Sequence, residues 1–140
     1  MAGKKEIEVA VAEVVDYMRI TGQFAPALRD VVIRKITAQA AKDSGIRVST
    51  EELQEASDAF RILNGLNKAE DTENWIKSSG ISVDVLEDFL ETNLLVSKFK
   101  DALLNKMDKE NILSSEKIQN VMRDLIFGEW AEKELQSTIL

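Results

Sequence analysis

The stretch from Ser82 to Met107 constrains the fold more than any other part of the chain. Its apolar residues recur mostly at spacings of three and four, which is the pattern of one face of an α-helix. They are Val85, Leu86, Phe89, Leu90, Leu94, Val96, Phe99, Leu103, Leu104 and Met107. Because neither proline nor glycine interrupts the stretch, we expect one helix of about 24 residues, roughly 36 Å long. Ser82 is its expected N-cap, and Gly80 is the expected end of the preceding helix. Such a helix must bury its apolar face against other helices.

Composition limits the function classes open to the chain. Its 140 residues fit one domain, residues 1–140, and no segment approaches the roughly 18 uninterrupted apolar residues of a membrane span. The formal net charge of −7, with no basic face, argues against nucleic-acid binding. Since the amino terminus lacks the pattern of a secretory signal, we expect a cytoplasmic protein.

Two helices are expected before residue 46. Residues 7–21 fit a helix, although Ile7–Val11 also alternate and a short strand is the alternative there. Residues 23–26 are the expected connector, and Pro26 suits the first turn of the second helix, which Gly45 ends. The expected apolar face of the second helix is Leu28, Val31, Val32, Ile36 and Ala40.

Two shorter helices are expected between residues 49 and 80. Ser49 and Glu52 form a predicted capping box at the start of the first, and Asn64-Gly65 ends it. Its predicted apolar face is Leu53, Ala56, Phe60 and Leu63. The second runs from Lys68 to Ser79, with acidic residues at its start, as the helix dipole favours.

The chain ends in one more predicted helix. A polar break at residues 108–111 separates the long helix from this last helix, which begins near Ser115. Its predicted buried stripe is Ile118, Val121, Met122, Leu125, Ile126 and Trp130. The sequence therefore predicts an all-α fold of about six helices around one long helix (83–107), with the carboxy-terminal helix (115–137) packing back on the amino-terminal half.

The order of these helices resembles the amino-terminal domain of SurA-like, parvulin-type peptidyl-prolyl isomerases. The match covers about residues 24–107, where residues 45–53 read GIRVSTEEL and residues 75–82 read WIKSSGIS. Residues 30–36 (DVVIRKI), 86–90 (LEDFL) and 66–72 (LNKAEDT) also fit, the last especially the cytosolic members of the family. The resemblance implies a helical chaperone domain that binds peptides.

The resemblance also identifies an absence. In this family a parvulin domain should follow the long helix, but here only residues 108–114 separate that helix from a segment similar to the family's carboxy-terminal helix. We interpret the chain as the helical domain without its catalytic insert. Parvulin catalysis uses histidines and a cysteine or aspartate in a β-rich pocket, and this sequence contains no histidine, no cysteine and no evident strand. We therefore expect no isomerase activity.

Another enzyme hypothesis rests on a stripe of carboxylates. Asp84, Glu87, Asp88 and Glu91 share one stripe of the long helix, and di-metal sites in helical bundles use such residues. Those sites also require Glu-x-x-His motifs, which the sequence lacks, so we interpret the stripe as a solvated face. No nucleotide-binding or nucleophile-elbow motif occurs, and neither a cofactor nor a metal is expected.

Two binding hypotheses remain. In the first, large apolar side chains line a groove that holds unfolded or precursor peptides, and methionine thioethers in its walls adapt to varied partners. The candidate groove residues are Met18, Phe24, Phe60, Trp75, Phe89, Met107, Met122 and Trp130. In the second, the same surface binds one partner protein, such as a biosynthetic enzyme, or a second copy of the chain. The apolar ending at Leu135 and Ile139-Leu140 favours the second hypothesis.

Overall fold

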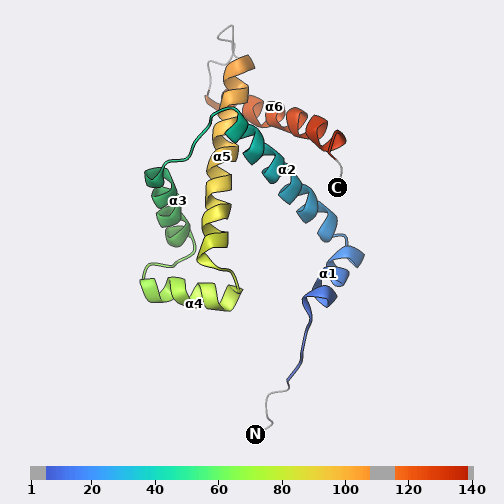
Figure 1. Cartoon of the computed structure of the whole chain (residues 1–140), viewed down its shortest axis with the longest axis vertical. Helices are drawn as coiled ribbons and strands as arrows, with labels where there is room; N and C mark the ends of the chain where they lie inside the picture. Colours follow the sequence, from blue (N-terminus) through green and yellow to red (C-terminus); the bar gives the residue numbers. More distant parts are fainter. Residues whose placement is uncertain (1–5, 108–115, 139–140) are drawn as a thin grey trace. The chain divides into compact units, whose positions relative to one another are not determined.

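The computed structural model describes residues 6–107 and 116–138, and all regular structure in these ranges is α-helical (Figure 1). The helices are α1 (Val11–Ile20), α2 (Phe24–Asp43), α3 (Thr50–Leu63), α4 (Ala69–Ser79), α5 (Val83–Met107) and α6 (Glu116–Gln136). The predicted all-α class and the long helix are therefore confirmed. The chain divides into two compact units, Met1–Ile33 and Arg34–Leu140, which are described separately.

The first unit contains α1 and the first part of α2. The helix expected over residues 7–21 is present from Val11 to Ile20, and residues 6–10 form neither helix nor strand. The predicted start at Ile7 and the alternative strand at Ile7–Val11 are therefore wrong. The Glu13 carboxylate accepts a hydrogen bond from the Ala10 amide, which fixes the start of α1 one residue later. Pro26 lies in the first turn of α2, as predicted, but this helix already begins at Phe24.

Apolar side chains of the first unit are largely uncovered. No residue of α1 is buried. Exposed hydrophobic side chains in this unit are Ile7, Val9, Val11, Val14, Tyr17, Ile20, Leu28 and Val31. Leu28 and Val31, expected on the apolar face of α2, are therefore exposed. Burial in α2 falls on Thr37 and Ala41 instead, in the second unit.

The core of the second unit lies where α2, α5 and α6 meet. Ala41 of α2 and Leu95 and Phe99 of α5 are buried together, and Trp130 of α6 packs against them. The Phe99 and Trp130 rings meet edge to face, with centroids 4.8 Å apart. The two residues of α2 that are fully buried, Thr37 and Ala41, both have small side chains.

Polar contacts also hold α6 on α5. The Arg123 guanidinium donates to the Ser97 carbonyl oxygen at 3.0 Å and forms an ion pair of 2.7 Å with Asp101. The buried stripe of α6 differs from the prediction, because it includes Ala131. Three residues predicted to be buried are exposed: Ile118, Val121 and Leu125.

Helix α3 packs along α5, and α4 connects the two helices. The predicted capping box is present, since the Ser49 amide donates to the Glu52 carboxylate at 3.0 Å and the Glu52 amide donates to the Ser49 hydroxyl at 3.1 Å. The predicted N-cap Ser82 accepts a hydrogen bond from the Val85 amide at 3.2 Å. Gly80 ends α4 with a φ of 70°, a conformation that glycine adopts without strain.

Two expectations concern other parts of the chain. The polar break at residues 108–111 lies outside the described residues. Among the helices that are described, none combines the length and the apolar character needed to cross a membrane.

Candidate functional site

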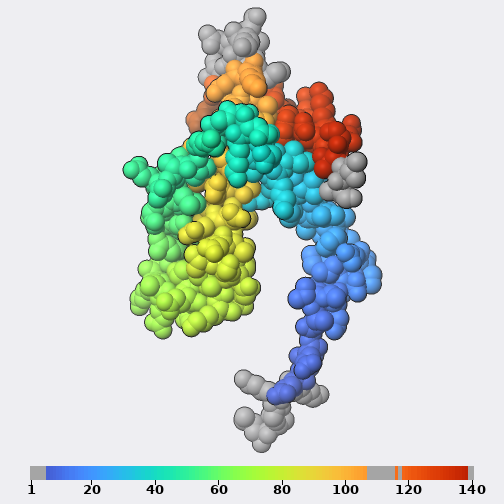
Figure 2. Space-filling model, in the orientation of Figure 1, coloured from blue at the N-terminus to red at the C-terminus, as the bar shows by residue number. Residues whose placement is uncertain are grey.

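An apolar cavity opens where α3, α4 and the first turns of α5 meet. Six residues line it, all hydrophobic: Phe60, Trp75, Ile81, Val85, Leu86 and Phe89. We call this space the apolar cavity; its volume is about 240 Å³. In Figure 2 the surface of α3 and α4, in green, lies directly against the first half of α5, in yellow. The cavity is therefore built within one unit of the chain.

Local sequence places each wall of the apolar cavity. Phe60 lies one turn before the end of α3, and Trp75 lies in the middle of α4. Their rings meet edge to face with centroids 5.3 Å apart and an interplanar angle of 71°. Aromatic pairs favour this arrangement because the positive edge of one ring faces the negative face of the other. The pair fixes α4 against α3 and leaves Trp75 half-buried beside the opening.

The α5 wall is held by a cation. The Arg34 guanidinium of α2 lies over the Phe89 ring, 4.6 Å from its centroid, and donates to the Phe89 carbonyl oxygen at 3.1 Å. It also donates to the Asn93 side chain. Arginine stacks on an aromatic face in this way because the ring quadrupole attracts it. Phe89 nevertheless remains 46% exposed, so its ring retains surface for a further partner.

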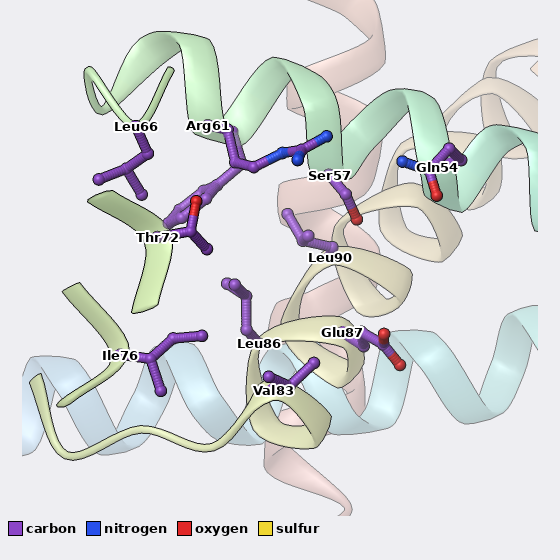
Figure 3. Close-up of a pocket in the computed structure, with 11 residues that line it drawn as sticks. Gln54, Ser57, Arg61, Leu66, Thr72, Ile76, Val83, Leu86, Glu87 and Leu90 are labelled. Carbon is purple, nitrogen blue, oxygen red and sulfur yellow. The ribbon is translucent and has the colours of Figure 1, made fainter. Parts of the chain in front are cut away.

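A second cavity, of about 210 Å³, adjoins the first and shares Phe60 and Leu86 with it. Figure 3 shows Ile76, Leu86 and Leu90 pointing into this adjoining cavity. Its lining also includes polar residues: Gln54, Ser57, Arg61, Thr72 and Glu87. The Arg61 guanidinium forms an ion pair with Asp58. The adjoining cavity thus has a polar rim where the apolar cavity has none.

The apolar cavity can bind a partner through hydrophobic contact. Its lining side chains carry no carboxylate, hydroxyl, amine or amide, so none of them can transfer a proton or attack a substrate. Its volume is below the range of about 300–1,000 Å³ typical of small-molecule sites. An engineered apolar cavity of about 150 Å³ binds benzene, so this space suffices for one large apolar side chain.

The structure brings together three of the eight residues predicted to line a groove. Phe60, Trp75 and Phe89 surround the apolar cavity. Trp130 contacts Phe99 in the core, and Phe99 lies ten residues beyond Phe89, or about 15 Å along α5. Met122 is half-buried on α6, and the side chain of Met107 lies outside what the structure describes.

Met18 and Phe24 belong to the first unit, where both are half-buried. The Arg19 guanidinium lies 4.7 Å from the centroid of the Phe24 ring.

Sequence reasoning did not name the other three residues of the apolar cavity. Val85 and Leu86 were assigned to the apolar face of the long helix but not to the groove. Ile81 follows the helix-ending Gly80, and a hydrophobic residue directly after such a glycine commonly packs back on the helix. That signal was available. No pattern in the sequence could have paired Arg34 with Phe89, which is 55 residues away.

The carboxylate stripe on α5 shows no metal-site geometry. Asp84, Glu87 and Asp88 are exposed, and Glu91 is half-buried. Within residues 6–107 and 116–138, acidic residues form no group of three that could hold a metal ion. The interpretation of the stripe as a solvated face is consistent with these positions.

Comparisons of the chain with protein-family models, with curated proteins and with solved structures found no match.

Proposed function

We propose that this protein binds apolar segments of unfolded or precursor polypeptides without catalysing a reaction on them. The apolar cavity carries the proposal, because its six hydrophobic walls open beside exposed surface of Val85 and Phe89. Covering this surface is favourable by roughly 25 cal/mol for each Å² of apolar area removed from water. A leucine or phenylalanine side chain of a bound peptide fits the space, and neighbouring apolar residues would contact the rim.

The resemblance to SurA-like chaperone domains supports the same function. The capping box at Ser49 and Glu52, the Gly80 helix end and the Ser82 N-cap all occur where the family-like motifs place them. Moreover, α6 packs on α5 through Arg123 and Trp130, as a carboxy-terminal helix that completes such a domain would. The lack of histidine and cysteine supports the non-catalytic part of the proposal.

A fluorescence titration tests the proposal. In the Trp130→Phe variant, Trp75 is the only tryptophan, and it lines the apolar cavity. An unstructured apolar peptide should produce a saturable change in its emission. The Val85→Gln substitution should weaken binding roughly fivefold, since covering a half-exposed valine contributes on the order of 1 kcal/mol.

A matched control uses Val121 on α6. Val85 and Val121 are 57% and 59% exposed, and both lie in helices, so Val121→Gln makes the same chemical change away from the apolar cavity. It should leave the peptide affinity unchanged. Equal weakening by both variants, or no saturable signal at all, would contradict the proposal. Turnover of a proline-containing test peptide above the uncatalysed rate would overturn its non-catalytic part.

A second function, a dedicated protein–protein interaction module, is favoured by a different observation. Ile118, Val121 and Leu125 form an exposed apolar ridge on α6, with the spacing of one helix face. Such patches commonly mark interfaces. If this ridge mediates self-association, sedimentation equilibrium should show a dimer, and Val121→Gln should shift it toward monomer. A monomer at all concentrations would exclude the homodimer.

A further inference from the structure

Negative charge is concentrated around the apolar cavity. Residues 50–91, which contain α3, α4 and the first turns of α5, include eleven acidic and three basic residues. Their formal net charge is therefore −8, whereas the whole chain carries −7. All six residues of the apolar cavity lie within this segment. The remainder of the chain is close to neutral, so the net negative charge of the chain comes from the segment that contains this site.

Among the described residues, ion pairs neutralise only a small part of this charge. Lys98 pairs with Glu52 at 2.6 Å, and Arg61 pairs with Asp58. Asp84, Glu87 and Asp88 are exposed on the same turns of α5 that supply Val85, Leu86 and Phe89 to the cavity. Charges on an exposed surface act over about 10 Å at 0.1 M ionic strength, so those on these turns reach the mouth of the cavity.

From these acidic residues we infer which class of peptide the site binds; this inference rests on the proposed function. The apolar cavity binds a segment with one large apolar side chain flanked by lysine or arginine residues. The hydrophobic anchor enters the space between Phe60, Trp75 and Phe89. The flanking cations lie over the acidic turns of α5, where opposite charge attracts the peptide during approach and excludes acidic competitors.

Two exposed apolar segments of a second copy of this chain fit the site poorly. The exposed apolar side chains between residues 6 and 20 lie among four acidic residues and one basic residue. The exposed ridge of α6 lies in a segment, residues 116–138, with five acidic and three basic residues. Both would meet like charge at the apolar cavity, which costs free energy. Charge complementarity favours a basic amphipathic segment as the occupant, and we assign that segment to another polypeptide.

A series of three peptides tests this inference. Each contains the same core of leucine and phenylalanine, flanked by lysine, glutamine or glutamate, and each is titrated against Trp75 emission in the Trp130→Phe variant. We expect the lysine peptide to bind tightest and the glutamate peptide weakest. Because the difference is electrostatic, it should shrink as salt is raised to about 0.5 M.

The outcomes separate this inference from the proposed function. Equal affinities for the three peptides would overturn the charge preference and leave the peptide-binding function standing. Tighter binding of the glutamate peptide would also overturn the inference. If none of the three binds, both the inference and the proposed function fail.

Paired variants locate the charge effect. Glu87→Gln with Asp88→Asn removes two charges beside the cavity, and Glu116→Gln with Glu129→Gln removes two exposed charges from α6. The first pair should weaken binding of the lysine peptide by about threefold to tenfold at low salt. It should leave the affinity for the glutamine peptide unchanged. The second pair should change the affinity for neither peptide. Equal effects of the two pairs would show that only the net charge matters and would overturn the local assignment.

Discussion

Glu52 connects three separate pieces of the chain through one carboxylate. It accepts a hydrogen bond from the Ser49 amide at the start of α3, and it accepts another from the Lys98 ammonium of α5 at 2.7 Å. The same ammonium donates to the Arg47 carbonyl oxygen at 2.7 Å. The Lys98 contact, followed by the Ser49 backbone hydrogen bond, lowers the pKa of Glu52 from 4.5 to about 2.

The lowered pKa predicts how stability depends on pH. A carboxyl group whose pKa is lower in the folded state stabilises the fold fully above its unfolded pKa, and this contribution is lost as the pH falls through the folded pKa. The Glu52 contribution should therefore be complete above about pH 4.5 and should disappear toward pH 2. Urea unfolding of Glu52→Gln, followed by circular dichroism, should show lower stability than wild type at pH 7. The variant should also lose less stability than wild type as the pH falls from 4.5 to 2.

The control for this prediction is Glu55→Gln, which changes an exposed glutamate of the same helix. Its stability should follow the wild-type pH profile. Identical pH profiles for Glu52→Gln and wild type would show that the Lys98 contact contributes nothing.

At the scale of the helices, several boundaries were predictable because they depend on neighbouring residues. The Ser49 and Glu52 capping box, the Asn64-Gly65 ending and the Gly80 ending were all read from the sequence and are present. The buried faces were less predictable. Leu63, expected on the apolar face of α3, is 85% exposed, whereas Leu66 is 8% exposed although it lies outside the helix.

The turn after α3 explains this exchange. The Leu66 amide donates to the Arg61 carbonyl oxygen at 2.8 Å, and the Gly65 amide donates to the Ile62 carbonyl oxygen at 3.2 Å, which is a Schellman motif. In this motif the residue after the glycine folds back over the last helical turn. Leu66 therefore occupies the buried position, and Leu63 turns to the surface. Helical spacing alone carries no information on this step.

Only part of the candidate site was predictable from the sequence. Phe60, Trp75 and Phe89 could be recognised as large apolar residues on three helices, but helical spacing does not say which faces meet. Leu95 illustrates the limit: it is 2% exposed, yet it lies five residues after Leu90 and was not assigned to the apolar face. Burial at Leu95 is set by α2, which packs on the second half of α5.

Alanine substitutions at two glycines should change the stability of the protein in opposite directions. Gly80 has a φ of 70°, while Gly128 lies inside α6, and a Cβ atom at either position would meet no neighbouring atom. Gly80→Ala should destabilise the protein by about 1 kcal/mol, because alanine is strained in the left-handed region. Gly128→Ala should stabilise it by about 0.5–1 kcal/mol, since alanine favours helix.

Urea unfolding midpoints of both glycine variants, compared with wild type, measure these shifts. A shift of the same sign in the two variants would show that side-chain packing, and not backbone conformation, decides the outcome.

At the scale of the second unit, α5 is the element that the other helices share. Its first turns help to enclose the apolar cavity with α3 and α4, and farther along the helix Leu95 and Phe99 pack with Ala41 of α2 and Trp130 of α6. Most of the stability of a helix in a protein comes from tertiary packing, so the 25-residue α5 depends on packing at both ends. Loss of the contacts at one end should therefore weaken the helix that forms the walls at the other.

The two tryptophans test this coupling because each reports on one end of α5. Trp75 lines the apolar cavity, and Trp130 packs against Phe99 in the core. In the Trp130→Phe variant, urea unfolding can be followed both by Trp75 emission and by circular dichroism. If α5 couples its two ends, the two probes should give the same midpoint. Trp75→Phe should likewise give coincident midpoints for Trp130 emission and circular dichroism. The further change Phe99→Ala, which removes a buried ring and should cost about 3–5 kcal/mol, should then lower the Trp75 midpoint as well. A Trp75 transition unaffected by Phe99→Ala would instead show that α3, α4 and the first half of α5 fold independently of α6.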